Sequence, residues 1–260
     1  MSSIIVPYMI LNRKSIGGRG FIYNYREIED EKNIRPFIDW GIKGSVKQCK
    51  AMNEERLHQW MFRLYMAARM ILSASHTIQA WDFALSNNLR VAAPHLLYNS
   101  LLSASRAAIF ACPWCEYSGG EIFTQTHTKS INLTTDILKK YDSDIADKYN
   151  ERATSLKDLR EVLTYKHPTS GDCHFDKARP DKEITLLCEI AQIQSELFEQ
   201  SYTKHVQQQF QFDLDKAPTS LFTHTNAEGS IIDQEDWYRL DYLKRKLRRP
   251  MNIRLLMTEG

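Results

Sequence analysis

The sequence has no apolar run long enough to cross a membrane, since none reaches the roughly eighteen residues that a spanning helix needs. The segment from Met1 to Tyr8 also lacks the basic and apolar regions of a secretory signal peptide. A cytoplasmic protein that does not bind membranes is therefore expected.

Cysteine is sparse, and charge of neither sign dominates. Five cysteines in 260 residues are too few, and odd in number, for a disulfide framework, so reduced thiols are expected. Lys and Arg total 34 against 32 Asp and Glu, a net charge of +2, which excludes a basic coat over the whole surface. Any nucleic-acid-binding surface must be local.

The chain is nevertheless 43% hydrophobic, enough for one large domain or for a core domain with appendages. Residues 1–45 alternate short apolar runs with turn formers, which predicts a β-rich extension of two or three short strands between Ile4 and Tyr25. Gly17, Gly18 and Gly20 indicate a turn here, because no Lys-Ser or Lys-Thr follows them as in a phosphate-binding loop.

Helical spacing of apolar residues begins at about residue 46 and predicts a mainly α bundle of four to five helices over 46–210. The second helix is expected to begin near Pro94, and its small residues at 99–109 predict a central position. The expected helices include the segments Leu57–Leu72, Asn99–Ile109, Leu133–Ile145, Leu156–Lys166 and Leu186–Phe198.

Residues 211–260 are expected to form a linker followed by a basic C-terminal segment. The stretch from Arg239 to Arg254 carries seven basic residues and one acidic residue, so the rest of the chain is mildly acidic. Together with Trp237 and Tyr238, the basic cluster suits contact with phosphates and bases, or with an acidic protein partner. The predicted nucleic-acid-binding residues are Lys244, Arg245, Lys246, Arg248 and Arg249.

The fourth predicted helix carries an arginine and a histidine on its apolar face. At about 100° per residue, Leu156, Arg160, Leu163 and His167 lie within about 60° of one another. A buried guanidinium needs an anionic partner, either an acidic side chain or a substrate phosphate. His167 precedes Pro168 and closes the helix, where the dipole favours the protonated imidazole.

A cation beside a titratable imidazole is suited to cleaving an RNA phosphodiester without a metal. The ribose 2′-OH attacks the adjacent phosphorus, the imidazole handles a proton, and the guanidinium holds the phosphoryl oxygens. The reaction requires RNA, because DNA has no 2′-OH.

The pair Arg160 and His167, with six residues between them in a helical chain, resembles the Arg-x4-6-His motif of HEPN domains. The resemblance covers about 46–210. It implies a four- or five-helix bundle, pairing with a second copy or a related subunit so that both motifs line one cleft, and metal-independent ribonuclease activity with no cofactor. It also implies a toxin or antiviral defence effector, held in check by a controlling antitoxin or sensor protein.

Two further residues are candidates for a supporting role. Glu161 stands where the family often has a neutral polar residue, so it can accept a proton or pin the arginine but also repels phosphate. Arg106 leans towards the interior of the helix that is expected to be central.

Other interpretations remain open. In a non-catalytic scaffold or regulatory subunit, Arg160 would form a core salt bridge, for example with Asp136, and His167 would only cap the helix. Cys112, Cys115 and His127, with Cys173 and His174, offer soft ligands for zinc, although their spacing is irregular. Four other histidines, which lack a nearby ligand partner, are interpreted as structural or surface residues: His76, His95, His205 and His224.

Overall fold

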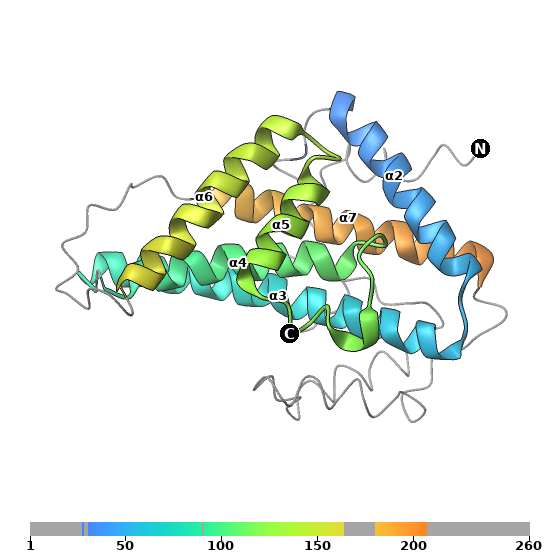
Figure 1. The fold of residues 1–260 in the computed structure, drawn as a ribbon, viewed down its shortest axis with the longest axis horizontal. Coiled ribbons are helices and arrows are strands. Elements are labelled where there is room, and N and C mark those ends of the chain that lie inside the picture. Colours follow the sequence, from blue (N-terminus) through green and yellow to red (C-terminus); the bar gives the residue numbers. More distant parts are fainter. Residues whose placement is uncertain (1–27, 29–30, 90, 164–179, 207–260) are drawn as a thin grey trace.

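A computed structural model of the protein describes residues 28, 31–89, 91–163 and 180–206. Within these residues the chain is mainly α, with no strand (Figure 1), which confirms the helical class. The helices are α2 (Glu31–Lys50), α3 (Glu54–Ser86), α4 (Ala93–Ala111), α5 (His127–Leu138), α6 (Ser143–Glu161) and α7 (Asp181–His205).

Helix α4 is the centre of the bundle, as its small residues predict. It lies alongside α3 over much of its length and also packs against α5, α6 and α7 (Figure 1). Ala104, Ala107 and Ala108 are fully buried, so neighbouring helices approach the α4 backbone closely. Pro94 lies in the first turn of α4, where its missing N–H costs nothing.

The predicted boundary between the third and fourth helices is wrong. A single helix was expected from Leu133 to Ile145, but α5 ends at Leu138 and α6 begins at Ser143. Asp142 causes the break, because its carboxylate caps α6 by accepting hydrogen bonds from the N–H groups of Asp144 (2.8 Å) and Ile145 (3.0 Å). The helix that carries Arg160 therefore starts thirteen residues before Leu156.

The N-terminal boundary at residue 45 also needs correction, because it falls inside α2. Residues 31–45 are helical rather than β-rich, although Pro36 and Gly41 interrupt the helical pattern in the sequence. Gly41 is needed for close packing on α7, since a Cβ there would lie 2.7 Å from Leu197 Cδ1. The strands expected between Ile4 and Tyr25 and the segment 211–260 lie outside the described residues.

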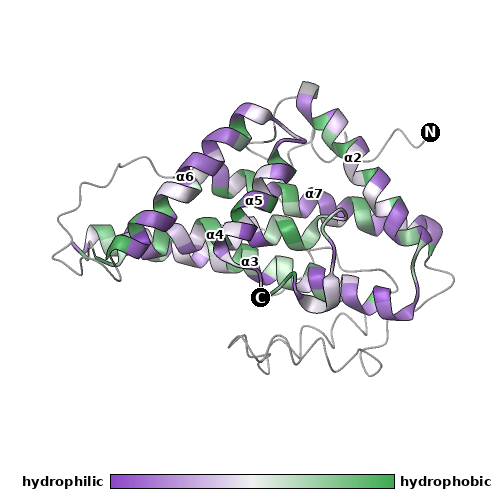
Figure 2. Cartoon of the chain, in the orientation of Figure 1, coloured by the Kyte–Doolittle hydropathy of each residue, from purple (hydrophilic) through white to green (hydrophobic). Residues whose placement is uncertain are grey.

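The core lies between α3, α4 and α7, with α2 covering one side of α7. Hydrophobic residues are concentrated along the inner helices, and hydrophilic residues are frequent on α2 and α6 (Figure 2). Trp60 of α3 stacks on Phe198 of α7 with 4.3 Å between the ring centroids, which adds a specific contact to apolar burial.

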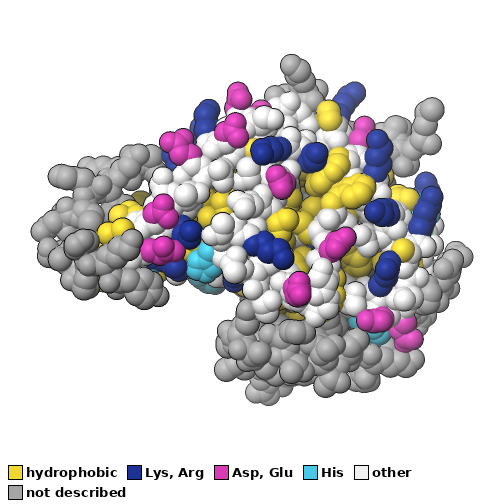
Figure 3. Space-filling model, in the orientation of Figure 1, with side chains coloured by type: hydrophobic (Ala, Val, Ile, Leu, Met, Phe, Trp, Pro, Cys, Tyr) yellow, Lys and Arg dark blue, Asp and Glu magenta, His cyan; other side chains and the backbone are white. Residues whose placement is uncertain are grey.

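Charges of both signs are interspersed on the visible face of the described part (Figure 3), as the net charge of +2 suggests. No helix among the described residues combines the length and apolar character needed to cross a membrane.

Gly44 of α2 leaves room for the loop that follows α4. Trp114 in this loop stacks on Trp40 with 6.1 Å between the ring centroids, and its indole N–H donates to the Trp40 carbonyl at 3.0 Å. A Cβ on residue 44 would lie 2.5 Å from Trp114 Nε1 and 2.8 Å from Pro113 Cγ.

Gly44→Ala is therefore expected to destabilise the protein by about 1–3 kcal/mol, because the loop must move to admit the methyl group. Helix propensity alone predicts the opposite sign, a gain of roughly 1 kcal/mol for alanine over glycine. Urea unfolding followed by tryptophan fluorescence distinguishes the two outcomes. A stabilised variant would show that the loop does not pack on α2 as described.

Candidate functional site

Arg160 lies in the last turn of α6 and faces Tyr98 of α4. Its guanidinium carbon is 5.0 Å from the centroid of the Tyr98 ring, within the range of a cation–π contact. The predicted apolar stripe is confirmed for its described members, since Leu156 and Arg160 are half-buried and Leu163 is buried. His167, the fourth member, lies outside the described residues.

Tyr98 also contacts His127, the first residue of α5. The two rings are 5.5 Å apart between centroids. Thr126 caps α5 by accepting a hydrogen bond from the Lys129 N–H at 3.3 Å, so His127 is held at the start of the helix. Tyr98 therefore brings the C-terminal end of α6 and the N-terminal end of α5 together.

Arg106 of α4, predicted as a supporting residue, lies near Tyr98 and His127. Its Nη2 donates to the carbonyl oxygen of Gln125 at 3.2 Å, two residues before His127. Its positive charge acts on both His127 and Tyr98. Together, Tyr98, Arg106, His127 and Arg160 make up what we call the α4–α5–α6 cluster.

The positive charges of the cluster affect the pKa of its histidine. Burial lowers the pKa of His127 below its ordinary value of 6.5, and the charges of Arg160 and then Arg106 lower it further, while Glu161 opposes them. Burial also raises the pKa of Tyr98 to about 12, so the phenol stays protonated. The arrangement offers two cations, a neutral imidazole and a hydroxyl donor.

The buried polar atoms at the cluster include the Tyr98 hydroxyl and the Gln125 side-chain carbonyl, neither of which has a hydrogen bond to a described residue. Leaving such groups unpaired costs about 1–3 kcal/mol each. Buried polar groups are nearly always satisfied, and exceptions often mark functional sites. The cluster therefore has spare hydrogen-bonding capacity beside its two arginines.

Glu161 pairs with a lysine of its own helix. Its carboxylate lies 4.0 Å from the Lys157 ammonium, one turn earlier on α6. At this distance, on a half-exposed surface, the pair contributes little to stability. The lysine does reduce the repulsion of phosphate that the sequence suggested for Glu161.

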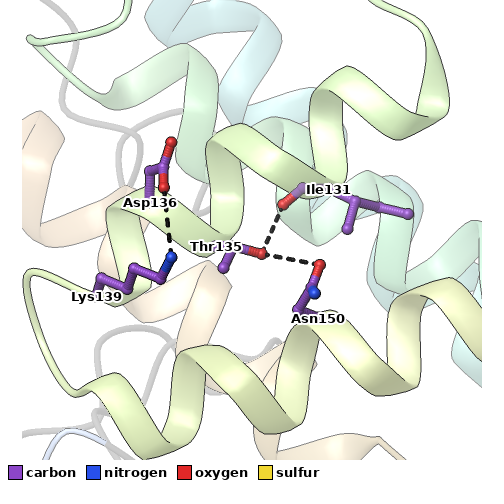
Figure 4. A network of polar contacts seen from close by, with 5 residues as sticks. All are labelled: Ile131, Thr135, Asp136, Lys139 and Asn150. Carbon is purple, nitrogen blue, oxygen red and sulfur yellow. Dashed lines mark hydrogen bonds and ion pairs between the residues drawn. The ribbon is translucent and has the colours of Figure 1, made fainter.

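Asp136, the acid named for a salt bridge with Arg160, points elsewhere. It is exposed on α5 and pairs with Lys139 at 3.9 Å (Figure 4). Its negative charge contributes to raising the pKa of Cys115. Close by, the Thr135 hydroxyl donates to the Ile131 carbonyl and contacts Asn150 of α6 at 3.4 Å, which fixes α5 against α6 (Figure 4).

The remaining candidates divide into those that are described and those that are not. No three His, Cys, Asp or Glu side chains gather in metal-binding geometry within the described residues, so Cys112, Cys115 and His127 do not form a zinc site among themselves. Cys173 and His174 fall outside those residues, as do the basic residues Lys244, Arg245, Lys246, Arg248 and Arg249.

Tyr98 and the position of His127 beside it were missed by the sequence interpretation. His127 was considered only as a zinc ligand, and Tyr98 has the appearance of an ordinary apolar position on a central helix. Nothing in the spacing links residues 98, 127 and 160, because they meet only when three helices pack.

No family model, curated protein or solved structure matches this chain.

His127 should titrate below pH 6.5 because its cationic form is buried near two arginines. The folded protein binds this proton more weakly than the unfolded chain, so the histidine's contribution to stability is complete above about pH 6.5. It is lost as the pH falls from there through the pKa of the folded state. NMR titration of the imidazole tests this, and both inorganic phosphate and Arg160→Gln are expected to raise the pKa. A value at or above 6.5 in the free protein would contradict the clustering.

Proposed function

We propose that this protein is a metal-independent endoribonuclease of the HEPN type, acting as a toxin or antiviral defence effector. The observation that carries the proposal is the convergence of Arg160, Arg106 and His127 around Tyr98. Two guanidinium groups from different helices suit the two non-bridging oxygens of one phosphodiester.

Each group has a role in transesterification. Arg160 holds the phosphoryl oxygens and stabilises the charge that grows on them in the transition state, with Arg106 in support. His127, whose depressed pKa keeps it neutral, accepts the proton of the 2′-OH. His167 acts as the general acid that protonates the leaving 5′-oxygen.

The N-terminal end of α5 adds to the attraction for phosphate. Backbone N–H groups and the positive end of the helix dipole favour an anion at this point. The predicted basic segment with Lys244, Arg245, Lys246, Arg248 and Arg249 extends RNA contact beyond the cleaved bond. Because each chain supplies one motif, a homodimer or a pairing with a related subunit completes the cleft, and a controlling partner restrains the activity in its own cell.

The test is incubation of the full-length protein with total RNA and a structured RNA in excess EDTA. We expect fragments that end in 2′,3′-cyclic phosphate, and no cleavage of DNA of the same sequence. Intact RNA under these conditions would overturn the proposal in favour of the second candidate.

A helical scaffold or regulatory subunit is that second candidate, favoured by an apolar tip at the α3–α4 turn. Phe83, Leu85, Leu89 and Val91 are 64%, 41%, 51% and 51% exposed. Four large apolar side chains within nine positions are unusual on a free surface and are typical of contact sites. This candidate needs no activity from Arg160, and a loss of folding in Arg160→Ala would support it.

A further inference from the structure

Arg63 of α3 is a buried cation in the middle of the bundle, with 2% of its surface exposed. Its guanidinium carbon lies 3.9 Å from the centroid of the Trp60 ring. Within the described residues, its hydrogen bonds go to backbone carbonyls at and beyond the end of α4, namely those of Phe110 (2.9 Å), Cys115 (3.0 Å), Ile109 (3.4 Å) and Cys112 (2.7 Å).

No carboxylate among the described residues pairs with Arg63. Burial lowers its pKa to about 10, while Cys115, Cys112 and Tyr117 favour the charged form. Carbonyl dipoles at a helix C-terminus stabilise a cation but carry no full negative charge. Among the described residues, the groups whose negative charge would stabilise the Arg63 cation are the Cys115 and Cys112 thiols, followed by the Tyr117 phenol.

The two thiols are held in a tight turn. The Cys115 N–H donates to the Cys112 carbonyl at 3.2 Å, and a turn of this kind brings the outer Cα atoms within about 7 Å. That separation is close to the range in which a disulfide forms. Both residues are free thiols in the structure.

The thiols are also inequivalent. Burial alone raises the pKa of Cys112, but the hydrogen bond from the Cys115 thiol, the backbone N–H of Trp114 and the charge of Arg63 bring it below its ordinary value. The pKa of Cys115 lies well above its ordinary value, because its proton is shared with Cys112. Cys115 is half-buried and Cys112 is 1% exposed, so an oxidant meets Cys115 first.

Helix α2 holds the turn from its other side. The Gln48 side chain donates to the Pro113 carbonyl at 2.8 Å, and the Lys47 ammonium lies 5.4 Å from the centre of a Trp114 ring. With Arg63 on the inner side, the turn has little freedom to separate its two cysteines. Preorganisation of this kind lowers the entropic cost of closing a bond.

We propose that Cys112 and Cys115 form a reversible intramolecular disulfide, with Arg63 as the positioning residue that holds both backbones in register. The oxidant is a peroxide. The Cys115 proton first passes along the hydrogen bond to the Cys112 sulfur. The Cys115 thiolate attacks one peroxide oxygen, the O–O bond breaks, and the departing hydroxide takes up a solvent proton and leaves as water, so that Cys115 becomes a sulfenic acid. The Cys112 sulfur then attacks that sulfur, the S–O bond breaks, and a second water is released as the disulfide forms.

In the balanced reaction, two thiols lose two electrons and two protons, and one hydrogen peroxide becomes two waters. Reduction by an external dithiol reverses the outcome through thiol–disulfide exchange at Cys115, the more accessible sulfur. From the sequence, this Cys-x-x-Cys pair is considered as part of a zinc site, and a redox role is disfavoured because the βαβ pattern that usually accompanies a redox pair is absent.

The test treats the reduced full-length protein with hydrogen peroxide, alkylates the remaining thiols and digests with trypsin. Both cysteines fall in the tryptic peptide 107–129. We expect this peptide to lose two hydrogens and take up no alkyl group after oxidation, and to take up two alkyl groups after dithiothreitol. The matched control Cys188→Ala removes a fully buried thiol from α7 and should leave the result unchanged.

Cys112→Ser should abolish the internal bond and leave Cys115 as a sulfenic acid that dimedone traps. A peptide that keeps both thiols under peroxide, or that links Cys115 to Cys173 or to a second chain, overturns the proposal. The wild-type measurement decides the matter even if Cys112→Ser does not fold.

Discussion

Arg160→Ala should lower the rate of RNA cleavage by about two to three orders of magnitude, the usual effect of removing one preorganised donor to a developing oxyanion. The side chain is half-buried and contacts the Tyr98 ring, so its loss should cost only about 1 kcal/mol of stability. A shift of a few degrees in the melting temperature is expected. Measuring the cleavage rate and the thermal unfolding of the same preparation separates the two effects.

Arg152→Ala is the matched control on the same helix. Arg152 is half-buried and pairs with Glu183 of α7 at 2.7 Å, so its loss should reduce stability while leaving cleavage unchanged. His167→Ala should abolish cleavage with little change in melting temperature. If Arg160→Ala unfolds the protein, or cleaves at the wild-type rate, the residue has a structural role and the scaffold is favoured.

Arg63→Met should be the most destabilising single change, at about 3–5 kcal/mol. Methionine fills much of the volume, but it leaves the carbonyls of Phe110, Cys112 and Cys115 buried without donors. Such a loss is a large fraction of the 5–15 kcal/mol that typically stabilises a domain. Equilibrium unfolding in urea measures it directly.

Arg56→Met supplies the comparison, since Arg56 lies seven residues earlier on α3, is exposed, and donates to one carbonyl, that of Ala51, at 3.2 Å. Its replacement should cost less than about 1 kcal/mol. Equal losses of unfolding free energy for the two substitutions would show that the buried hydrogen bonds of Arg63 stabilise the protein no more than the exposed one of Arg56.

The helical class and most of the helices could be predicted from the spacing of apolar residues. The apolar residues in Leu57–Leu72 share one face only if the segment is helical, and that face can then be buried. The sequence interpretation was wrong where capping determines the ends of a helix and where packing determines whether a glycine is needed. Asp142 ends one helix and begins another although apolar residues continue on both sides. Gly41 and Gly44 suggest a break in a helix, yet α7 and the Trp114 loop need them for close contact.

Half of the candidate site follows from the sequence in the same way. Arg160 was identified because it interrupts an apolar stripe, and Arg106 because it lies on a helix of small residues. Tyr98 and His127 belong to helices whose mutual packing no local pattern specifies. Arg63 was missed because it lies off the apolar stripe Leu57–Leu72, so its spacing is that of a surface residue until its carbonyl partners are known.

Cleavage of two RNA oligonucleotides in excess EDTA tests the central claim most directly. They are identical except that the nucleotide 5′ of the cleaved bond carries either ribose or 2′-deoxyribose. The account predicts cleavage of the all-ribose strand to a 2′,3′-cyclic phosphate, and an intact bond where the 2′-OH is missing. Cleavage beside the deoxynucleotide, or of neither strand, would contradict it.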